Sequence, residues 1–247
     1  MSREFRTDDW NAYKMVYAEP HRELESPERE VEVVAGALEA LRDAGIIPGT
    51  EYDELRFLAH RRAVKEHFDI PWTAITPRMQ RLLYAVTAIT RPARVIAAGV
   101  FCGNTFVSNA GAAVGPGACY EAEDLVGVEI DAEKADGARR NVRRIDPTGV
   151  ARIVADDAVK VAADYAEPVG LLYLDADGGP EQGKGIYLDI LEAAWEKIPP
   201  GGVILAHNSV NCAERLEHYL TFVRDEANCR ASVNVVFDPE GLEISVK

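Results

Sequence analysis

Gly99 and Gly103 follow an apolar run at residues 95–98, in a segment that reads GVFCGNT over residues 99–105. Glycine lets the backbone pass close to a ligand, and the hydroxyl of Thr105 together with the amides of a following helix can bind a carboxylate. Glycines at this spacing also serve ordinary strand-to-helix turns. The loop is therefore either a ligand-binding turn or a plain connection, and other residues must decide between the two.

Acidic residues stand at the ends of the next three apolar runs. Glu129 lies in the run 125–130 and can accept both hydroxyl groups of a ribose, as an acid after the second strand does in dinucleotide-binding folds. Alternatively, it is a surface carboxylate that the positive end of the next helix favours. Asp157 can accept the exocyclic amine of adenine or serve as an ordinary helix N-cap, and Asp175 follows the fourth run. With the glycine loop, these acids favour a nucleoside-containing ligand.

Short apolar runs alternate with helical patterns through the rest of the chain, as buried parallel strands in βαβ units do. The runs are residues 95–98, 125–130, 153–155, 171–174 and 203–206, and helices are expected at 104–113, 132–145, 157–164 and 184–197. Residues 233–237 and 242–246 flank the turn DPEG and indicate an antiparallel hairpin. We predict an α/β fold with a Rossmann-like doubly wound sheet, mostly parallel, which ends in this C-terminal hairpin. Ligands of such sheets lie beyond the carboxyl ends of the strands, where the loop and the acids fall.

The N-terminal part has a different pattern, and we divide the chain into a helical extension, residues 1–75, and a catalytic domain, residues 76–247. Residues 1–30 are polar and leave their order open. Two helices are expected, from Ser26 to Gly45 and over residues 52–67. Their apolar stripes are formed by Val31, Val34, Leu38 and Leu41 and by Leu55, Leu58 and Ala59. Because such stripes need a partner, the extension is expected to act as a cap or as a dimerisation arm.

Composition limits the classes of partner. The chain has 247 residues and 47% hydrophobic content, which suits one substantial core with an appended element. A formal net charge of −14 disfavours nucleic acid as a substrate. The four cysteines are far apart, so neither a zinc site nor a disulfide framework is indicated. No secretory or membrane-spanning segment is recognised, and we expect a soluble, cytoplasmic protein.

The combination of motifs resembles the class I S-adenosylmethionine-dependent methyltransferases, and within them the catechol O-methyltransferase-like group. The matching segments are GVFCGNT at 99–105, VGVEID at 126–131, LDAD at 174–177, PGGVI at 200–204, Asn208, and the helix start ITP at 75–77. The resemblance covers roughly residues 75–247 and implies S-adenosylmethionine as the cofactor. The residues it implies for cofactor binding are Ile75, Gly99, Val100, Phe101, Gly103, Thr105, Glu129, Ile130, Asp157, Ala158 and Asp175.

Three departures from the family pattern concern the chemistry above the cofactor. Family members hold a divalent metal through positions that correspond here to Asp175, His207 and Asn208, and imidazole suits zinc, iron or nickel better than magnesium. The family lysine that acts as the base is replaced by Gly178, with Lys184 a few residues further on in an apparent insertion. The acid that helps to hold the aminoacyl end of the cofactor is Ala97. Whether a metal is used stays open.

These departures leave several functions open. The leading one is methyl transfer to a small molecule, most simply to a hydroxyl group, by a homodimer with no nucleic-acid or membrane partner. His207 is a candidate general base because an imidazole titrates near neutral pH, although a histidine at a strand end can equally serve structure alone. Lys184 is the second catalytic candidate. The alternatives are cyclisation or aminobutyryl transfer from the same cofactor, and a non-catalytic cofactor-binding subunit.

Overall fold

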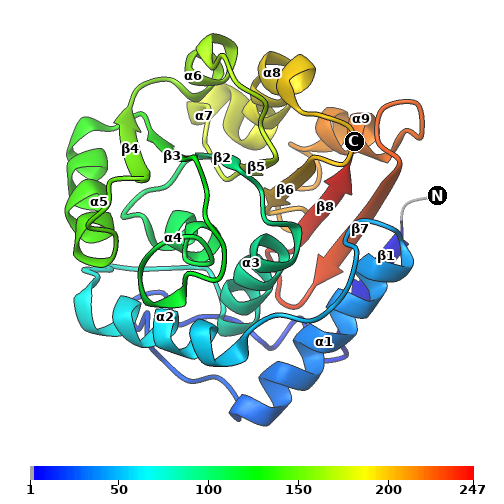
Figure 1. Ribbon diagram of the computed structural model, residues 1–247. Coiled ribbons are helices and arrows are strands. Elements are labelled where there is room, and N and C mark those ends of the chain that lie inside the picture. The colour runs from blue at the N-terminus through cyan, green and yellow to red at the C-terminus, as the bar shows by residue number, and fades with distance from the viewer. Residues whose placement is uncertain (1–2) are drawn as a thin grey trace.

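The computed structural model describes residues 3–247, and its centre is one mixed sheet (Figure 1). Within these residues the sheet has eight strands in the order β1-β7-β8-β6-β5-β2-β3-β4. The strands are β1 (Arg3–Arg6), β2 (Arg94–Ala98), β3 (Asp124–Glu129), β4 (Ala151–Ala155), β5 (Leu171–Leu174), β6 (Val203–His207), β7 (Ala231–Val236) and β8 (Leu242–Val246). Every pairing is parallel except those of β8, which is antiparallel to both β6 and β7. The predicted fold class and its closing hairpin are confirmed.

Helices cover both faces of the sheet. They are α1 (Pro27–Asp43), α2 (Glu54–His67), α3 (Pro77–Thr90), α4 (Asn104–Ala110), α5 (Ala132–Ile145), α6 (Ala158–Asp164), α7 (Gly179–Gln182), α8 (Ile186–Ala194) and α9 (Glu217–Arg224). Single 3-10 turns span Gly115–Gly117, Gly183–Gly185 and Trp195–Lys197. The side chains of β2 show the two layers, since Val95 and Ala97 pack in the core under α1 to α5, whereas Ile96 and Ala98 pack under α6, α8 and α9 (Figure 1). Because β2 to β6 are paired in parallel, their carboxyl ends lie at a single edge of the sheet.

The helix starts follow the capping rules from which they were predicted. The Ser26 side chain accepts a hydrogen bond from the backbone N–H of Arg29, and proline occupies the first turn of α1. Thr76 caps α3 in the same way, with its hydroxyl oxygen 3.4 Å from the backbone nitrogen of Met79. The Thr76 hydroxyl also donates to the buried carboxylate of Asp238, 2.7 Å away. The start of α3 is therefore tied to the turn between β7 and β8.

Two features of the N-terminal part differ from the sequence expectations. Residues 3–6 form an edge strand paired with β7, which sequence patterning does not reveal because the strand is short and mostly exposed. Helix α2 buries Phe57, His60 and Ala63, not the expected stripe, and Leu55 is 79% exposed. The expected stripe fails because charged residues surround it on the outer face, whereas the aromatic ring of Phe57 packs against α3 through Tyr84.

A buried ion-pair network joins the N-terminal segment to α3. The guanidinium of Arg78, almost fully buried, bonds to both carboxylate oxygens of Asp9 at 2.8 Å and to Glu25, and it stacks on the ring of Tyr13. One turn later, Arg81 is equally buried and pairs with Glu30 of α1. Buried arginines need such partners, so these contacts fix residues 9–30 against the fold.

None of the helices within residues 3–247 has the length and hydropathy to span a bilayer.

Candidate active site

The glycine loop has the backbone conformation that its residues suggest. Gly99 has φ +79°, and a Cβ atom there would lie 2.5 Å from the backbone of Ala176, so a side chain is excluded both by strain and by space. Gly103 has φ +89° and precedes the first residue of α4. Between them, Phe101 holds a left-handed φ of +50° that is uncommon for an aromatic residue. The loop thus brings backbone from the end of β2 close to the end of β5.

Glu129 ties this loop to the end of β3. Its carboxylate accepts the backbone N–H of Phe101 on Oε2 at 2.8 Å and that of Asp131 on Oε1 at 3.1 Å, and the residue is 8% exposed. A carboxylate offers about four acceptor positions, so each oxygen keeps capacity for a further donor. Next to it Ile130 leaves 70% of its surface exposed, which is unusual for a large apolar residue. An acceptor beside an exposed apolar side chain is the arrangement expected for a nucleoside.

Asp157 is the N-cap of α6, the structural alternative considered for it. Its Oδ1 atom accepts the backbone N–H groups of Val159 at 2.7 Å and Lys160 at 3.3 Å. Both bonds fall on Oδ1, which leaves Oδ2 available to a ligand amine. The neighbouring Asp156 pairs with the Lys160 ammonium at 2.9 Å. Capping therefore accounts for one oxygen of Asp157, and the contact with adenine stays a prediction.

A cavity of about 200 Å³ at the carboxyl ends of the strands gathers most of the residues selected from the sequence. Those that line it are Ile75, Gly99, Val100, Phe101, Thr105, Asp175, Lys184, His207 and Asn208. Gly103, Glu129, Ile130, Asp157 and Ala158 do not line it. Asn104 and Thr73 line it without having been selected, and they bond to each other at 3.2 Å. Asn104 lies between the selected residues Gly103 and Thr105, but a polar side chain at a helix start is too common to single out, and Thr73 lies in a loop that carries no signal of its own.

Aromatic residues wall one side of the cavity. Trp72 lines it and packs on Phe101 with ring centroids 4.8 Å apart, leaving about half of its own surface exposed. Tyr17, also half-exposed, lies next to Trp72 and donates its hydroxyl hydrogen to Glu240 at 3.2 Å. The backbone oxygen of Tyr17 accepts the N–H of Thr73. The polar N-terminal segment, unassigned from the sequence, therefore reaches the edge of the site.

Three charged side chains meet at the ends of β5 and β6. The ammonium of Lys184 lies 2.8 Å from Oδ1 of Asp175 and 3.0 Å from its backbone oxygen. His207 Nδ1 lies 3.4 Å from Asp175 Oδ2, while neither ring nitrogen of His207 has a hydrogen-bond partner within residues 3–247. The hydroxyl of Tyr187, which is fully buried, lies 3.5 Å from Asp175 Oδ1. Asp175 is thus the centre of the cluster.

The cluster shifts the titration of its members in opposite directions. Burial alone raises the pKa of Asp175, but the positive charges of His207 and Lys184 outweigh burial and hold that pKa below its usual value. Burial alone lowers the pKa of His207, yet the carboxylate of Asp175 outweighs it and raises that pKa above its usual value. Asp175 is therefore ionised at neutral pH, and His207 takes up a proton more readily than a free imidazole.

The donor set does not fit a hard divalent cation. Magnesium prefers several oxygen ligands in octahedral geometry. Here Asp175 already faces an ammonium and an imidazole, and the Asn208 amide donates to the Asn211 side chain at 3.1 Å. Among residues 3–247, no group of three His, Cys, Asp or Glu side chains is placed to hold a metal ion. The positive charge beside Asp175 comes from Lys184.

Comparison with known proteins places this geometry in a family context. Residues 96–209 match the family model described as a methyltransferase domain. Comparison with curated proteins gave no significant sequence match.

Solved structures share the fold at low sequence identity. The O-methyltransferase from Bacillus cereus in complex with SAH has a TM-score of 0.56 and 17% identity, with 88% of this chain and 100% of that chain covered. The O-methyltransferase TomG from Streptomyces achromogenes, in complex with SAM, gives 0.59 and 17%, covering 90% and 99%. The SAH-bound methyltransferase of Podospora anserina gives 0.59 and 12%, covering 92% and 99%. Residues 96–209 therefore resemble a methyltransferase domain, and the chain shares the fold of these S-adenosylmethionine- and S-adenosylhomocysteine-bound structures.

Proposed function

We propose that this chain transfers the methyl group of S-adenosylmethionine to a hydroxyl group of a small molecule. The observation that carries the proposal is the hydrogen bond from the backbone N–H of Phe101, in the glycine loop, to the carboxylate of Glu129. It places a carboxylate and the glycine-loop backbone side by side at the carboxyl ends of β2 and β3. The methyltransferase family match over residues 96–209 supports the same chemistry.

The residues of this chain suggest a pose for the cofactor. Glu129 accepts the ribose hydroxyls, and the exposed side chain of Ile130 covers the adenine ring. Asp157 Oδ2 accepts the adenine amine next to Ala158. The aminoacyl end lies at Thr105 and the first amides of α4. In this pose, Gly99 and the cluster at Asp175 would border the reacting methyl group, since they line the same cavity.

The bound cofactor supplies an electrophilic methyl group, and this chain's residues prepare the acceptor. His207 removes the proton of the acceptor hydroxyl, because its ring nitrogens are free of other partners and it lines the cavity. Asp175 holds the imidazolium that forms, and Lys184 keeps Asp175 ionised. Trp72 and Phe101 exclude water from one side. No metal is required in this scheme, since the Lys184 ammonium supplies the positive charge near the developing oxyanion.

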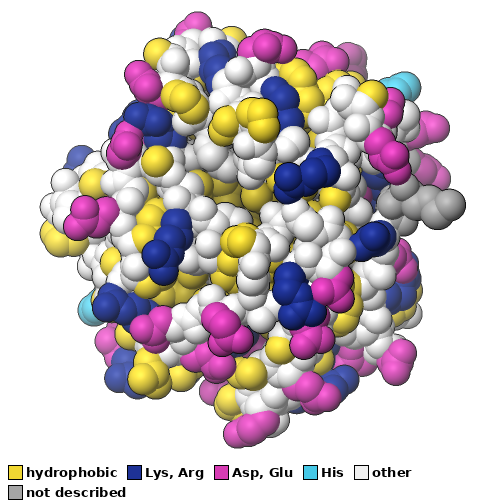
Figure 2. Space-filling model, turned by 45° about the vertical axis from the view of Figure 1, so that its right-hand side comes forward, with side chains coloured by type: hydrophobic (Ala, Val, Ile, Leu, Met, Phe, Trp, Pro, Cys, Tyr) yellow, Lys and Arg dark blue, Asp and Glu magenta, His cyan; other side chains and the backbone are white. Residues whose placement is uncertain are grey.

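The N-terminal segment, the surface charge and the cysteines bear on how the acceptor is enclosed, on the class of acceptor and on the compartment. We propose that residues 3–75 cover the cleft, because Tyr17 and Trp72 stand at its edge, and that Leu55, exposed on α2, contributes to a homodimer. Lys and Arg side chains are scattered among Asp and Glu on the face seen in Figure 2, which favours a small acceptor over nucleic acid. All four cysteines are free thiols, as expected in a reducing cytoplasm.

Product analysis tests the proposed reaction directly. The enzyme is incubated with S-adenosylmethionine and a library of hydroxylated small molecules, and the nucleoside product is identified by mass spectrometry. We expect S-adenosylhomocysteine and an acceptor heavier by one methylene unit. Methylthioadenosine would instead show chemistry on the aminobutyrate chain, the alternative that Ala97 leaves open by removing an acid near the aminoacyl end. Tight cofactor binding without turnover would indicate a non-catalytic subunit.

A further inference from the structure

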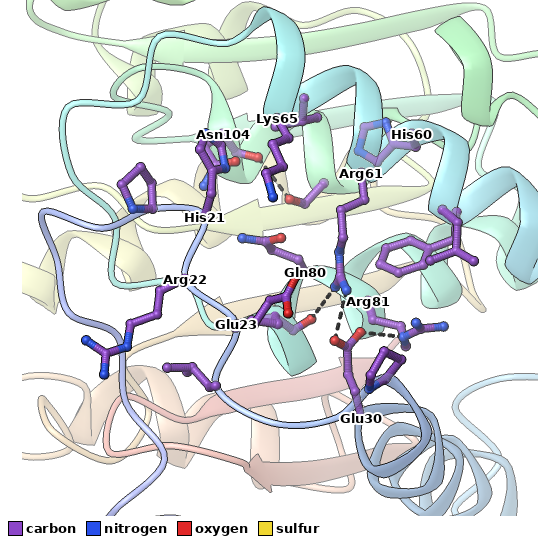
Figure 3. Close-up of a pocket in the computed structure, with 18 of the residues that line it drawn as sticks. His21, Arg22, Glu23, Glu30, His60, Arg61, Lys65, Gln80, Arg81 and Asn104 are labelled. Carbon is purple, nitrogen blue, oxygen red and sulfur yellow. Dashed lines mark hydrogen bonds and ion pairs between the residues drawn. The ribbon is translucent and has the colours of Figure 1, made fainter.

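A second cavity, of about 230 Å³, lies outside the site described above (Figure 3). It is enclosed by the N-terminal residues 20–27, by α2, by the start of α3 and by the first turn of α4. Asn104 lines both cavities, and its side-chain amide donates to the hydroxyl of Thr73, which lines only the first. The Asn104–Thr73 pair is therefore the partition between a cofactor cavity and a separate chamber.

The arginines that line this chamber are paired with acids, whereas Lys65 has no ion pair within residues 3–247. Glu30 accepts hydrogen bonds from Arg61 at 2.8 Å and from Arg81 at 2.5 Å, so the charge of each guanidinium group has a carboxylate partner (Figure 3). Lys65 has no hydrogen bond or ion pair with any residue in the described range 3–247. The Lys65 side chain is exposed, and its charge adds to the larger effect of burial in lowering the pKa of His21, so the two groups lie within electrostatic range of one another.

Unused donors and an apolar wall complete the chamber. The Nε atom of Arg61 is buried and makes no hydrogen bond within residues 3–247. The labelled side chains of His21, Lys65 and Asn104 gather at one end of Figure 3, and Glu23 lies apart from them. The lining also includes the apolar side chains of Leu24, Leu58, Val64 and Ile70.

From this arrangement we propose that the chamber is a second ligand site, which takes a small monocarboxylate with an apolar body. The carboxylate lies against the Lys65 ammonium at the polar end, where Asn104 is in reach, and the apolar body lies on Leu58, Val64 and Ile70. A carboxylate in this place pairs with an exposed ammonium that has no ion pair within residues 3–247, and the apolar body removes exposed side-chain surface from water. The site is independent of the cofactor cavity because the Asn104–Thr73 pair separates the two.

Isothermal titration calorimetry with 4-phenylbutyrate and its uncharged amide, 4-phenylbutanamide, tests the proposal. The two probes share the apolar body and differ only in charge. Each is titrated into the wild type, into Lys65→Met and into Arg62→Met, with and without saturating S-adenosylhomocysteine. Arg62 is an exposed cation on the same helix that does not line the chamber, so it is the matched control. Thermal melting of each variant shows that it is folded.

We expect one saturable site for 4-phenylbutyrate, at least tenfold weaker binding of the amide, and a comparable loss in Lys65→Met only. Saturating S-adenosylhomocysteine should leave the affinity within about twofold. Absence of saturable 4-phenylbutyrate binding, equal binding of acid and amide, an effect of Arg62→Met equal to that of Lys65→Met, or displacement by S-adenosylhomocysteine would each overturn the proposal. The titrations without S-adenosylhomocysteine do not depend on the proposed methyl transfer, so the two ideas can fail separately.

Discussion

The ammonium of Lys184 lies 2.8 Å from Oδ1 of Asp175, at the end of β5 and inside the cavity that the glycine loop borders. The same lysine also donates to the Asp175 backbone oxygen, so it is held at two points. A fixed cation beside a buried carboxylate provides, from the chain itself, the charge that related sites are expected to take from a metal ion.

Chelation should therefore leave the proposed methyl transfer intact. We expect turnover in excess EDTA to stay within about twofold of the untreated enzyme, and added magnesium to have no effect, because Lys184 already neutralises Asp175. Steady-state assays with and without metal check this. The His207→Asp variant is the matched comparison, since it adds an oxygen ligand beside Asp175 and should bind magnesium measurably in calorimetry.

Loss of activity in chelator and recovery with magnesium alone would refute metal independence. Recovery with zinc, iron or nickel but not magnesium would show instead that His207 coordinates the metal, and the base would then be Lys184 or a group of the acceptor.

Replacing His207 with alanine should lower turnover by about 10²–10⁴-fold while the cofactor dissociation constant changes little. A general base must be unprotonated, so kcat/KM of the wild type should fall as pH drops through a pKa above the usual 6.5 of histidine, since Asp175 raises it. His218 is exposed on α9, and His218→Ala is the control. If His207→Ala keeps both the rate and the acidic limb of the profile, His207 serves structure alone.

Replacing Glu129 with alanine should weaken S-adenosylhomocysteine binding at least tenfold, because each charge-assisted hydrogen bond to ribose is worth about 1.5–3 kcal/mol. Calorimetry measures the affinity. Glu133→Ala removes an exposed acid from the first turn of α5 and should leave the affinity for S-adenosylhomocysteine unchanged. Equal dissociation constants for wild type and Glu129→Ala would move the ribose site elsewhere. Melting temperatures are compared as well, since Glu129 also accepts the backbone N–H of Phe101.

Replacing Arg78 with methionine should destabilise the fold by about 3–5 kcal/mol, because the mostly buried carboxylate of Glu25 and the part-exposed one of Asp9 lose their shared buried partner. Urea unfolding measures this loss. Arg22→Met, which breaks only an exposed pair with Glu19, should change stability by less than about 1 kcal/mol. Similar losses in both variants would show that the Arg78 network adds nothing beyond a surface contact.

The same network predicts a pH dependence. The hydrogen bonds from Arg78 lower the pKa of Asp9 to about 2. A depressed carboxyl pKa stabilises the fold above the unfolded pKa of 3.8 and loses that contribution as the pH falls toward 2. Wild-type stability should therefore decline through this range more steeply than that of Arg78→Met.

Sequence patterns predicted the central sheet well because its strands are buried on both faces. Short apolar runs such as 171–174 leave no alternative to a strand, and the caps at Ser26 and Thr76 fix helix starts by local hydrogen bonding. The edge strand Arg3–Arg6 was missed because its polar, exposed residues carry no such signal. A helix end also moved, since α4 ends at Ala110, with Gly111 as its C-cap, where residue 113 was expected.

The site was predicted in part for a related reason. Residues that follow strands, such as Gly99 and Asp175, converge by topology alone, and the cavity collects them. Contacts between distant segments have no local signature. Tyr17 reaches Glu240 across 223 positions, and nothing in the polar stretch around Tyr17 foretells it. The bond from Lys184 to Asp175 likewise depends on how the 3-10 turn Gly183–Gly185 folds back.

The pairing of β1 with β7 constrains the order in which the molecule can be completed during synthesis. Residues 3–6 leave the ribosome well before residues 233–236, which are their hydrogen-bonding partners. Until residues 233–236 have been made, the strand Arg3–Arg6 has no partner strand, whereas Asp9 and Glu25 can already reach Arg78. The contacts of Arg78 can therefore form early, and this edge of the sheet closes only after β7 has been synthesised.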